Sequence, residues 1–177
     1  AGVKRREQAL AIQYKRANTT IDITTVTTSQ TFSRAMDFSE HGTYKFFLYG
    51  DNSNNTFFMR IGTPGNYFEF KTSLDFTGWR LYELDIEDKN RDGQMDRNAE
   101  RPFGAMWRGR VGSPSLRNIT QISVGVIIPP GAPDPAFKKI YIDDIFLTDA
   151  VKITGQAYRT NGSFDWPRWG AWGASWR

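Results

Sequence analysis

The most specific chemical pattern in the sequence is a short acidic run in the middle of the chain. Positions 1, 3, 5 and 9 of a calcium-binding loop are filled by oxygen-bearing side chains, namely Asp88, Asn90, Asp92 and Asp96. Gly93 falls at position 6, where such a loop turns sharply, and the backbone carbonyl of Gln94 falls at position 7. Carboxylate and amide oxygens at this spacing converge on a hard cation, so the run predicts a calcium site.

The run departs from a complete calcium loop at its last ligand. Position 12 is Ala99, and the first carboxylate beyond it is Glu100, one residue later. The helices that flank an EF-hand are also missing from the pattern. A soluble turn rich in Asp, Asn and Gly is therefore the alternative. In the calcium hypothesis, Glu100 joins the ligands and the ion has a structural role, which is to order a long connection.

A second carboxylate pair, Asp143 and Asp144, lies between Ile142 and Ile145 in a predicted strand. Strict alternation cannot place both isoleucines on one face, so we expect a β-bulge that restores the inward pattern and aims one carboxylate at a partner. A buried carboxylate needs a cation, an arginine or backbone donors, so both acids are further candidate metal ligands. A solvent-facing pair is the alternative. Adjacent strand residues point to opposite faces, which disfavours a glycoside hydrolase pair.

Two tryptophans are candidates for ligand binding. Trp79 and Trp107 could provide stacking platforms for sugar rings, with Asn, Asp and Arg groups supplying hydrogen bonds. Trp79 begins a predicted strand, where packing in the core is favoured over a binding platform, and Trp107 lies in a long connection, where neither role is favoured. Most of the 13 phenylalanines are better explained as core packing.

The residue inventory argues against catalysis. The chain has no Cys and a single His, so thiolate chemistry and a His-rich zinc centre are excluded, and a Ser-His-Asp triad depends on His41 alone. His41 lies in a polar turn, and no nucleophile elbow or phosphate-binding loop accompanies it. We therefore expect no catalytic residues and no enzymatic activity.

The charge of the chain is weakly basic, with a net charge of +4 and an isoelectric point near 9.4. Basic residues cluster at positions 4–6 and again at positions 101–117. Neither cluster forms the aromatic-interleaved basic stripe that is typical of a nucleic-acid binder. We expect no nucleic-acid partner.

Short β-rich runs must position these side chains, because almost no stretch has the 3.6-residue spacing of a helix. Nine runs are predicted strands: residues 9–14, 20–27, 44–49, 56–61, 67–72, 79–86, 119–127, 139–147 and 152–159. The near-continuous apolar run 122–128 indicates a strand covered on both faces. The sequence therefore predicts an all-β fold, specifically an antiparallel two-sheet jelly-roll sandwich.

Connections between the runs complete the predicted organisation. Loops at residues 51–55 and 63–66 carry turn-forming Asn, Pro and Gly, and are expected to join three consecutive strands into a meander. The connection 87–117 is too long for a passive loop and is expected to have its own organisation. A shift in composition near Asp149 divides a sandwich domain, residues 1–149, from an aromatic tail, residues 150–177.

The tail is unusually rich in Trp, Gly and Ala from Gly162 onward. Exposed apolar segments of this kind mark a contact with a partner or a membrane, and Trp is favoured at membrane interfaces. We expect a docking segment, or one that enters an outer-membrane barrel; a tail that folds back over the sandwich is the alternative.

Several short motifs resemble known families. Residues 78–84 (GWRLYEL) and 140–145 (IYIDDI) resemble jelly-roll carbohydrate-binding modules and galactose-binding-like domains, which often carry a structural calcium. Residues 7–10, 60–62, 67–70, 141–149 and 155–159 are similar to sandwich segments in the outer-membrane translocon of the Bacteroidetes type 9 secretion system and related cell-surface proteins.

The second resemblance implies a role in protein secretion or gliding motility at the cell surface. Our leading hypothesis is thus a non-catalytic β-sandwich of a bacterial cell-surface or outer-membrane protein, with other parts of that protein or the secretion machinery as partners. The alternative is a calcium-stabilised carbohydrate-binding module whose partners are glycans.

Overall fold

The computed structural model describes residues 9–16, 23–88, 91–95, 107–131, 134–150, 161–166 and 170–175. Over these residues the secondary structure consists of strands, with no helix. Accordingly, the described part of the chain offers no long apolar helix of the kind that crosses a membrane.

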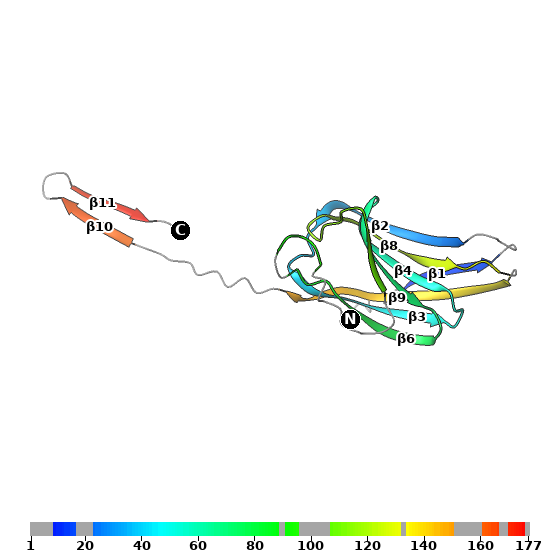
Figure 1. Ribbon diagram of the computed structural model, residues 1–177. Helices are drawn as coiled ribbons and strands as arrows, with labels where there is room; N and C mark the ends of the chain where they lie inside the picture. The colour runs from blue at the N-terminus through cyan, green and yellow to red at the C-terminus, as the bar shows by residue number, and fades with distance from the viewer. Residues whose placement is uncertain are drawn as a thin grey trace, which may run out of the picture.

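Nine strands form two antiparallel sheets that face each other (Figure 1). The four-stranded sheet has, in order, β1 (Leu10–Arg16), β9 (Asp134–Ala150), β3 (His41–Asp51) and β6 (Thr77–Asp85). The five-stranded sheet has, in order, β2 (Thr24–Met36), β8 (Ile119–Ile128), β4 (Thr56–Thr63), β5 (Asn66–Ser73) and β7 (Trp107–Val111). The chain passes repeatedly from one sheet to the other, as in a jelly roll. The predicted all-β antiparallel two-sheet sandwich is confirmed.

The strand bounds differ from the prediction where alternation is weak. β2 continues to Met36, because its run of Thr and Ser pairs with β8 although it carries little apolar signal. β7 was not predicted, since it lies within the long connection and pairs with β5 alone. The predicted strand 152–159 lies outside the described residues.

The predicted three-stranded meander is wrong at its first turn. β4 and β5 do form a hairpin, but β3 belongs to the other sheet, so residues 51–55 cross between the sheets. The crossing loop is held by the segment before β6: Asn52 N–H donates to the Phe76 carbonyl at 2.8 Å, and Leu74 N–H donates to the Asn55 carbonyl at 2.8 Å. Asn52 has a positive φ of 53°, which Asn tolerates and which allows the reversal.

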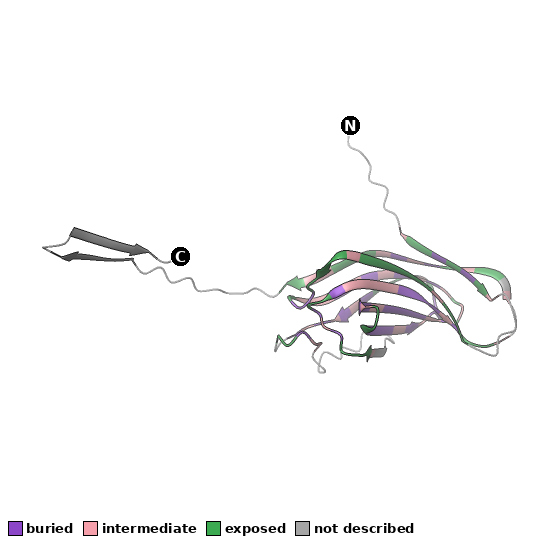
Figure 2. Ribbon diagram, turned by 90° about the horizontal axis from the view of Figure 1, so that it is seen from above, coloured by how far each residue is buried: buried purple, intermediate pink, exposed green. Residues whose placement is uncertain are grey.

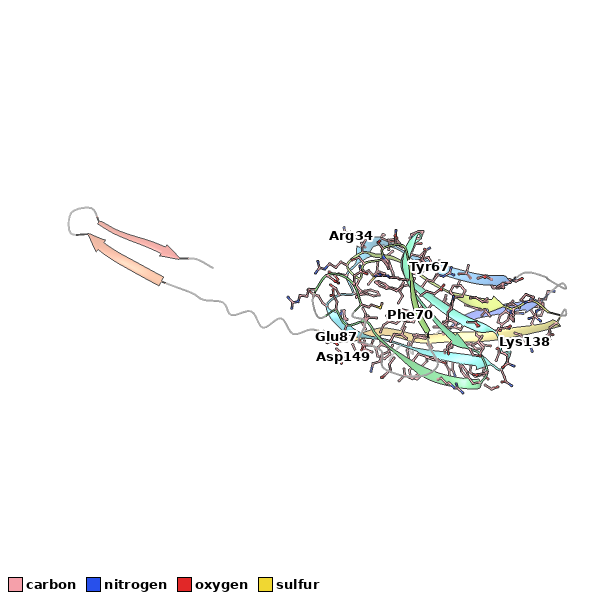
Figure 3. All side chains as sticks on the ribbon, in the orientation of Figure 1. Arg34, Tyr67, Phe70, Glu87, Lys138 and Asp149 are labelled. Atoms are coloured by element: carbon pink, nitrogen blue, oxygen red, sulfur yellow. The ribbon has the colours of Figure 1, made fainter. Side chains whose placement is uncertain are left out.

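The core lies between the sheets and follows strand alternation. In β3, Tyr44, Phe46 and Leu48 point inward and are buried, while the residues between them are partly exposed. Figure 2 shows buried and more exposed stretches following one another along the strands of the sandwich. The five-stranded sheet contributes buried inward residues in the same way: Phe57, Met59, Ile61, Phe68, Phe70, Val124, Val126 and Ile128. In β5, Phe70 is buried, whereas Tyr67 is half-buried on the outward side (Figure 3). The predicted packing of the phenylalanines is confirmed.

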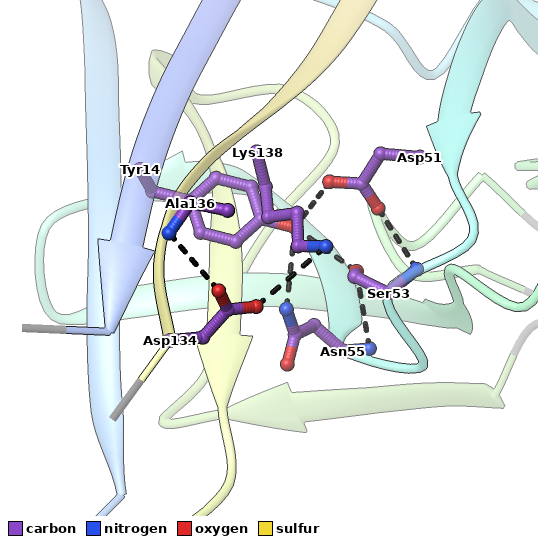
Figure 4. A network of polar contacts seen from close by, with 7 residues as sticks. All are labelled: Tyr14, Asp51, Ser53, Asn55, Asp134, Ala136 and Lys138. Carbon is purple, nitrogen blue, oxygen red and sulfur yellow. Dashed lines mark hydrogen bonds and ion pairs between the residues drawn. The ribbon is translucent and has the colours of Figure 1, made fainter. Parts of the chain in front are cut away.

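A polar network ties the crossing loop to the edge strand β1 (Figure 4). The Tyr14 hydroxyl donates to Asp51 Oδ2 at 2.6 Å and lies 3.0 Å from Ser53 Oγ, and Asn55 Nδ2 donates to it at 3.3 Å. Burial and the hydrogen bond to Asp51 raise the pKa of Tyr14 to about 12. The neutral phenol therefore fixes the loop at neutral pH.

A separate hairpin lies in the predicted tail. β10 (Asn161–Trp166) pairs with β11 (Gly170–Ser175) in an antiparallel register that matches Phe164 with Trp172. The boundary between residues 149 and 150, and the docking role of the tail, stay predictions.

Candidate functional site

Three aromatic side chains form a row across the outward face of the four-stranded sheet. The strand register places Tyr49 of β3 opposite Trp79 of β6 and also opposite Tyr141 of β9. The ring centroid of Tyr49 lies 5.5 Å from that of Trp79 and 5.6 Å from that of Tyr141, and both pairs have edge-to-face geometry. We call these three residues the aromatic row.

The two tyrosines of the row lie on the outside of the sandwich because each alternates with a buried neighbour. Leu48 and Ile142 point into the core, so Tyr49 and Tyr141 point out and are half-buried. Trp79 is 50% exposed, on the edge strand β6. The structure thus places Trp79 at the surface, as the stacking hypothesis requires, and the favoured prediction that it packs in the core is wrong.

The surroundings of the row provide both apolar and polar contacts. On one side the register places Leu81, which is 46% exposed, opposite the half-buried Phe47. On the other side it places Thr77 opposite Asp51. Both oxygens of Asp51 already accept hydrogen bonds, from the Tyr14 hydroxyl and the Ser53 N–H, so Thr77 is the polar neighbour of the row. An apolar ring surface beside a hydroxyl group suits a ligand with apolar ring faces and polar edges, such as a sugar.

The sequence placed Trp107 in a long loop, but in the structure it lies in a strand. It is the first residue of β7 and is paired with Lys71 of β5, on the five-stranded sheet. It therefore belongs to the other sheet from the aromatic row, and its side chain lies outside the described part of the structure. Sequence analysis missed the two partners of Trp79 in the aromatic row, Tyr49 and Tyr141, because only strand pairing brings them beside Trp79.

A polar cleft of about 200 Å³ lies on the outward face of the five-stranded sheet. Its lining residues come from β2, β4, β5 and β8 and the turn after β4: Thr27, Ser29, Arg60, Gly62, Thr63, Pro64, Tyr67, Gln121 and Ser123. We call this the polar cleft. Small side chains line it on β2 and β8, namely those of Thr27, Ser29 and Ser123.

Arg60 is the charged group of the polar cleft. Its Nε donates to Glu69 Oε2 at 2.7 Å, and its guanidinium lies 4.5 Å from the Phe58 ring centroid and 4.9 Å from that of Tyr67. Lys71 Nζ lies 2.7 Å from the other oxygen of Glu69. Burial alone would raise the pKa of Glu69, but the hydrogen bonds from Lys71 and Arg60 outweigh it and hold that pKa below its usual value.

The predicted calcium loop follows β6 and is organised around Asp88, which is buried. Asp88 Oδ1 accepts the Asp92 N–H at 3.0 Å, and Asp88 Oδ2 accepts the Gly93 N–H at 2.8 Å. Gly93 has a φ of +85°, as expected of the residue that makes the sharp turn. Each carboxylate oxygen keeps a second lone pair for a cation.

The rest of the predicted ligand set is only partly described. Asp92 is exposed and its Oδ1 accepts the Gln94 N–H at 2.7 Å, while Gln94 Nε2 donates to the Pro114 carbonyl at 2.5 Å. The other three ligands of the loop lie outside the described residues: Asn90, Asp96 and Glu100. Within the described ranges no three His, Asp or Glu side chains gather as a metal site.

The predicted β-bulge at Asp143 and Asp144 is present. Between Lys45 and Phe47 of β3, the pairing on β9 moves from Phe146 to Asp143, and Asp144 has a positive φ of 47°. The inward pattern resumes after the bulge at Leu147, which pairs with the buried Tyr44 and packs against the core, whereas Ile145 is 45% exposed and does not join it.

The two carboxylates of the bulge are not buried: Asp143 is half-buried and Asp144 is exposed. Asp143 Oδ1 accepts the Asp144 N–H at 3.0 Å. Asp143 and Asp144 lie within β9, whereas Asp88 lies beyond the end of β6. Among the described residues, the two acids do not form a metal site together with the predicted calcium loop. Their role as metal ligands stays a prediction.

Comparison with known proteins identifies the fold and no family. No family model and no curated protein matches the chain. Among solved structures, that of an exo-beta-agarase is similar, with a TM-score of 0.51 and 12% sequence identity. The match covers 81% of this chain and 23% of the agarase chain, so the shared sandwich is less than a quarter of that protein.

Proposed function

We propose that this domain binds a neutral glycan on the aromatic row and does not cleave it. The observation that carries the proposal is the half-exposed Trp79, aligned with Tyr49 and Tyr141 across three strands. A rigid sheet holds the three rings in place, so little conformational entropy is lost when a sugar stacks on them. The similarity in fold to part of an exo-beta-agarase supports a carbohydrate ligand.

The proposal includes no hydrolysis because the row offers no evident acid pair. Glycoside hydrolysis needs two carboxylates that face the bond from opposite sides. The nearest described pair in sequence, Asp143 and Asp144, consists of successive residues at a bulge and has its own local hydrogen bond. We therefore assign the surface to binding.

Replacing Trp79 with alanine should weaken glycan binding by about tenfold or more, because truncation of the most exposed aromatic anchor of the row costs about 1.4 kcal/mol or more. The measurement is affinity gel electrophoresis of the 177-residue chain against a panel of soluble neutral polysaccharides, followed by calorimetry with the one that retards the protein most.

Two variants provide controls for that experiment. Trp79→Phe keeps a ring and should retain most of the affinity. Met36→Ala removes a side chain of similar exposure, 41%, from the other sheet and should bind like the wild type. Equal retardation of Trp79→Ala and wild type would refute the assignment, and release of reducing sugar by the purified protein would refute the absence of hydrolysis.

A structural calcium ion is the second part of the proposal. The described residues fit such an ion: Asp88 is preorganised by two backbone N–H groups, and the Gly93 carbonyl accepts the Leu116 N–H at 2.7 Å, so the loop is tied to the segment before β8. The residues that would hold the ion are Asp88, Asn90, Asp92, Gln94, Asp96 and Glu100. Bound there, calcium would supply charge neutralisation and would fix the loop.

Calcium should raise the melting temperature, because a ligand of the native state adds stability that grows with its concentration. Thermal melting of the wild type from chelator to millimolar calcium measures the shift. Asp92→Ala should abolish it, whereas Asp75→Ala, which changes an acid outside the loop, should not. A midpoint that is identical in chelator and in calcium would contradict the proposal.

For the cellular location and the macromolecular partners of the domain, we keep the proposal that the sequence motifs suggest. A place at the cell surface or outer membrane, with secretion machinery or a larger surface protein as partner, is a proposal that rests on the motif resemblance alone. A surface glycan ligand is compatible with that location.

A further inference from the structure

The polar cleft has a different chemistry from the aromatic row and lies on the other sheet. Its lining combines hydroxyl groups, one amide, one phenol and one guanidinium. Such groups fix the orientation of a polar ligand, and the aromatic row offers mainly ring surfaces. The two surfaces therefore suit different parts of a ligand, or different ligands.

The guanidinium of Arg60 is held rigidly from three directions. Glu69 fixes its Nε, and the rings of Phe58 and Tyr67 lie 4.5 and 4.9 Å from it. Phe58 is fully buried although it belongs to the outward side of β4, because Gly125 on the neighbouring strand leaves space for its ring. A guanidinium held in this way loses little side-chain entropy when it binds a ligand.

The hydrogen-bonding capacity that remains on Arg60 belongs to its terminal nitrogens. Among the described residues, the guanidinium is hydrogen-bonded to the protein through its Nε, which donates to Glu69. The side chain is 32% exposed and lines the cleft, so the two Nη groups are available to a ligand. Paired nitrogens of this kind bind a carboxylate in a bidentate manner.

The charge balance favours an anionic group. The lining residues carry one formal charge, the positive charge of Arg60, and no carboxylate. Glu69 is adjacent but is engaged by both Arg60 and Lys71, so these three residues together keep a net charge of +1. An added anion would therefore be attracted to the cleft.

The size and the remaining lining select the ligand class. At about 200 Å³ the cleft is smaller than the roughly 300–1,000 Å³ pockets that hold drug-sized molecules, so it suits a single sugar unit. Ser29 and Ser123 have their hydroxyl oxygens 2.8 Å apart, and Gln121 lines the same wall. Hydroxyl and amide groups around one arginine match a sugar ring that carries a carboxylate.

We infer that the polar cleft binds the carboxylate of a uronic acid residue through Arg60, as a second, acid-selective glycan site. The inference rests on the proposed glycan-binding function for its ligand class, but its residues and its sheet are separate from the aromatic row. Arg60 and the ring of Tyr67 hold the acidic unit, and the serine and glutamine side chains contact its hydroxyl groups.

The test is an NMR titration of the full chain that follows the Arg60 Nε–Hε signal. The probes are galacturonate, glucuronate and mannuronate oligosaccharides, each with its carboxyl-reduced neutral counterpart. We expect at least one acidic oligosaccharide to shift the signal saturably and its neutral counterpart to bind about tenfold more weakly. No shift with any of the acidic oligosaccharides would overturn the inference.

Variants separate this site from the aromatic row. Arg60→Lys keeps the charge beside Glu69 but loses the paired nitrogens, and should lower the acidic affinity about tenfold. Gln121→Ala leaves the Arg60–Glu69 pair intact and should weaken binding severalfold. Trp79→Ala should leave the shift of the Arg60 signal unchanged. The experiment therefore distinguishes failure of the proposed binding at the aromatic row from failure of the proposed binding in the polar cleft. Inorganic phosphate binding as tightly as the uronate would also overturn the assignment.

Discussion

Phe46→Ala should lower the free energy of unfolding by about 3–5 kcal/mol, because it removes a fully buried ring from the centre of the core. The Phe46 ring stacks on Tyr82 with centroids 5.5 Å apart and lies 5.9 Å from Phe57 of the other sheet. Its removal leaves a cavity between the two sheets. Urea denaturation followed by fluorescence measures the loss.

The control for this prediction is the same substitution at an exposed ring. Phe137 in β9 is 59% exposed, so Phe137→Ala should change stability by about 0.5 kcal/mol or less. Similar losses for the two variants would mean that Phe46 does not lie in the core, and the packing of the sheets described above would be wrong.

Gly125→Ala should destabilise the fold by about 2–3 kcal/mol, at the upper part of the range for overpacking. A Cβ at this position would meet the carbonyl oxygen of Val26 and would lie 2.7 Å from two ring atoms of Phe58. The backbone of a paired strand cannot move aside without breaking the β2–β8 ladder. A melting temperature lower by several degrees, measured by circular dichroism, is the expected result.

Gly65→Ala is the matched control for the glycine prediction. Gly65 lies in the turn between β4 and β5, and a Cβ there would meet no atom within 4 Å. Its stability should stay within about 0.5 kcal/mol of the wild type. A Gly125→Ala variant as stable as Gly65→Ala would contradict the close contact of Gly125 with β2 and with the Phe58 ring, against which the Arg60 guanidinium lies.

The sandwich could be predicted because buried strands alternate clearly. In the run 44–49 buried and partly exposed residues alternate, and the run 56–61 is short, rich in apolar residues and bounded by turns, so the fold class and most strands follow from local pattern. The sheet to which each strand belongs depends on long-range pairing. Residues 51–55 have hairpin chemistry, but hydrogen bonds to Phe76 and Leu74 turn them into a crossing between sheets.

The candidate sites were less accessible to sequence analysis for the same reason. Trp79 could be singled out as a large aromatic residue at the start of a strand, but Tyr49 and Tyr141 lie 30 and 62 positions away and join it only through the register. Arg60 and Glu69 are adjacent across the β4–β5 hairpin, whose predicted turn at residues 63–66 offered a usable signal. The contribution of Ser29 and Ser123 to the cleft depends on the pairing of β2 with β8, which no local pattern specifies.

The most direct test of the glycan-binding claim is a titration of the full chain with the neutral oligosaccharide that binds best, following the indole N–H signal of Trp79. Trp79→Phe identifies that signal among the six tryptophans by its loss. The account predicts a saturable shift of the Trp79 signal, together with shifts of Tyr49 and Tyr141. Binding of the same oligosaccharide with no change at Trp79, or the absence of binding across the whole panel, would contradict it.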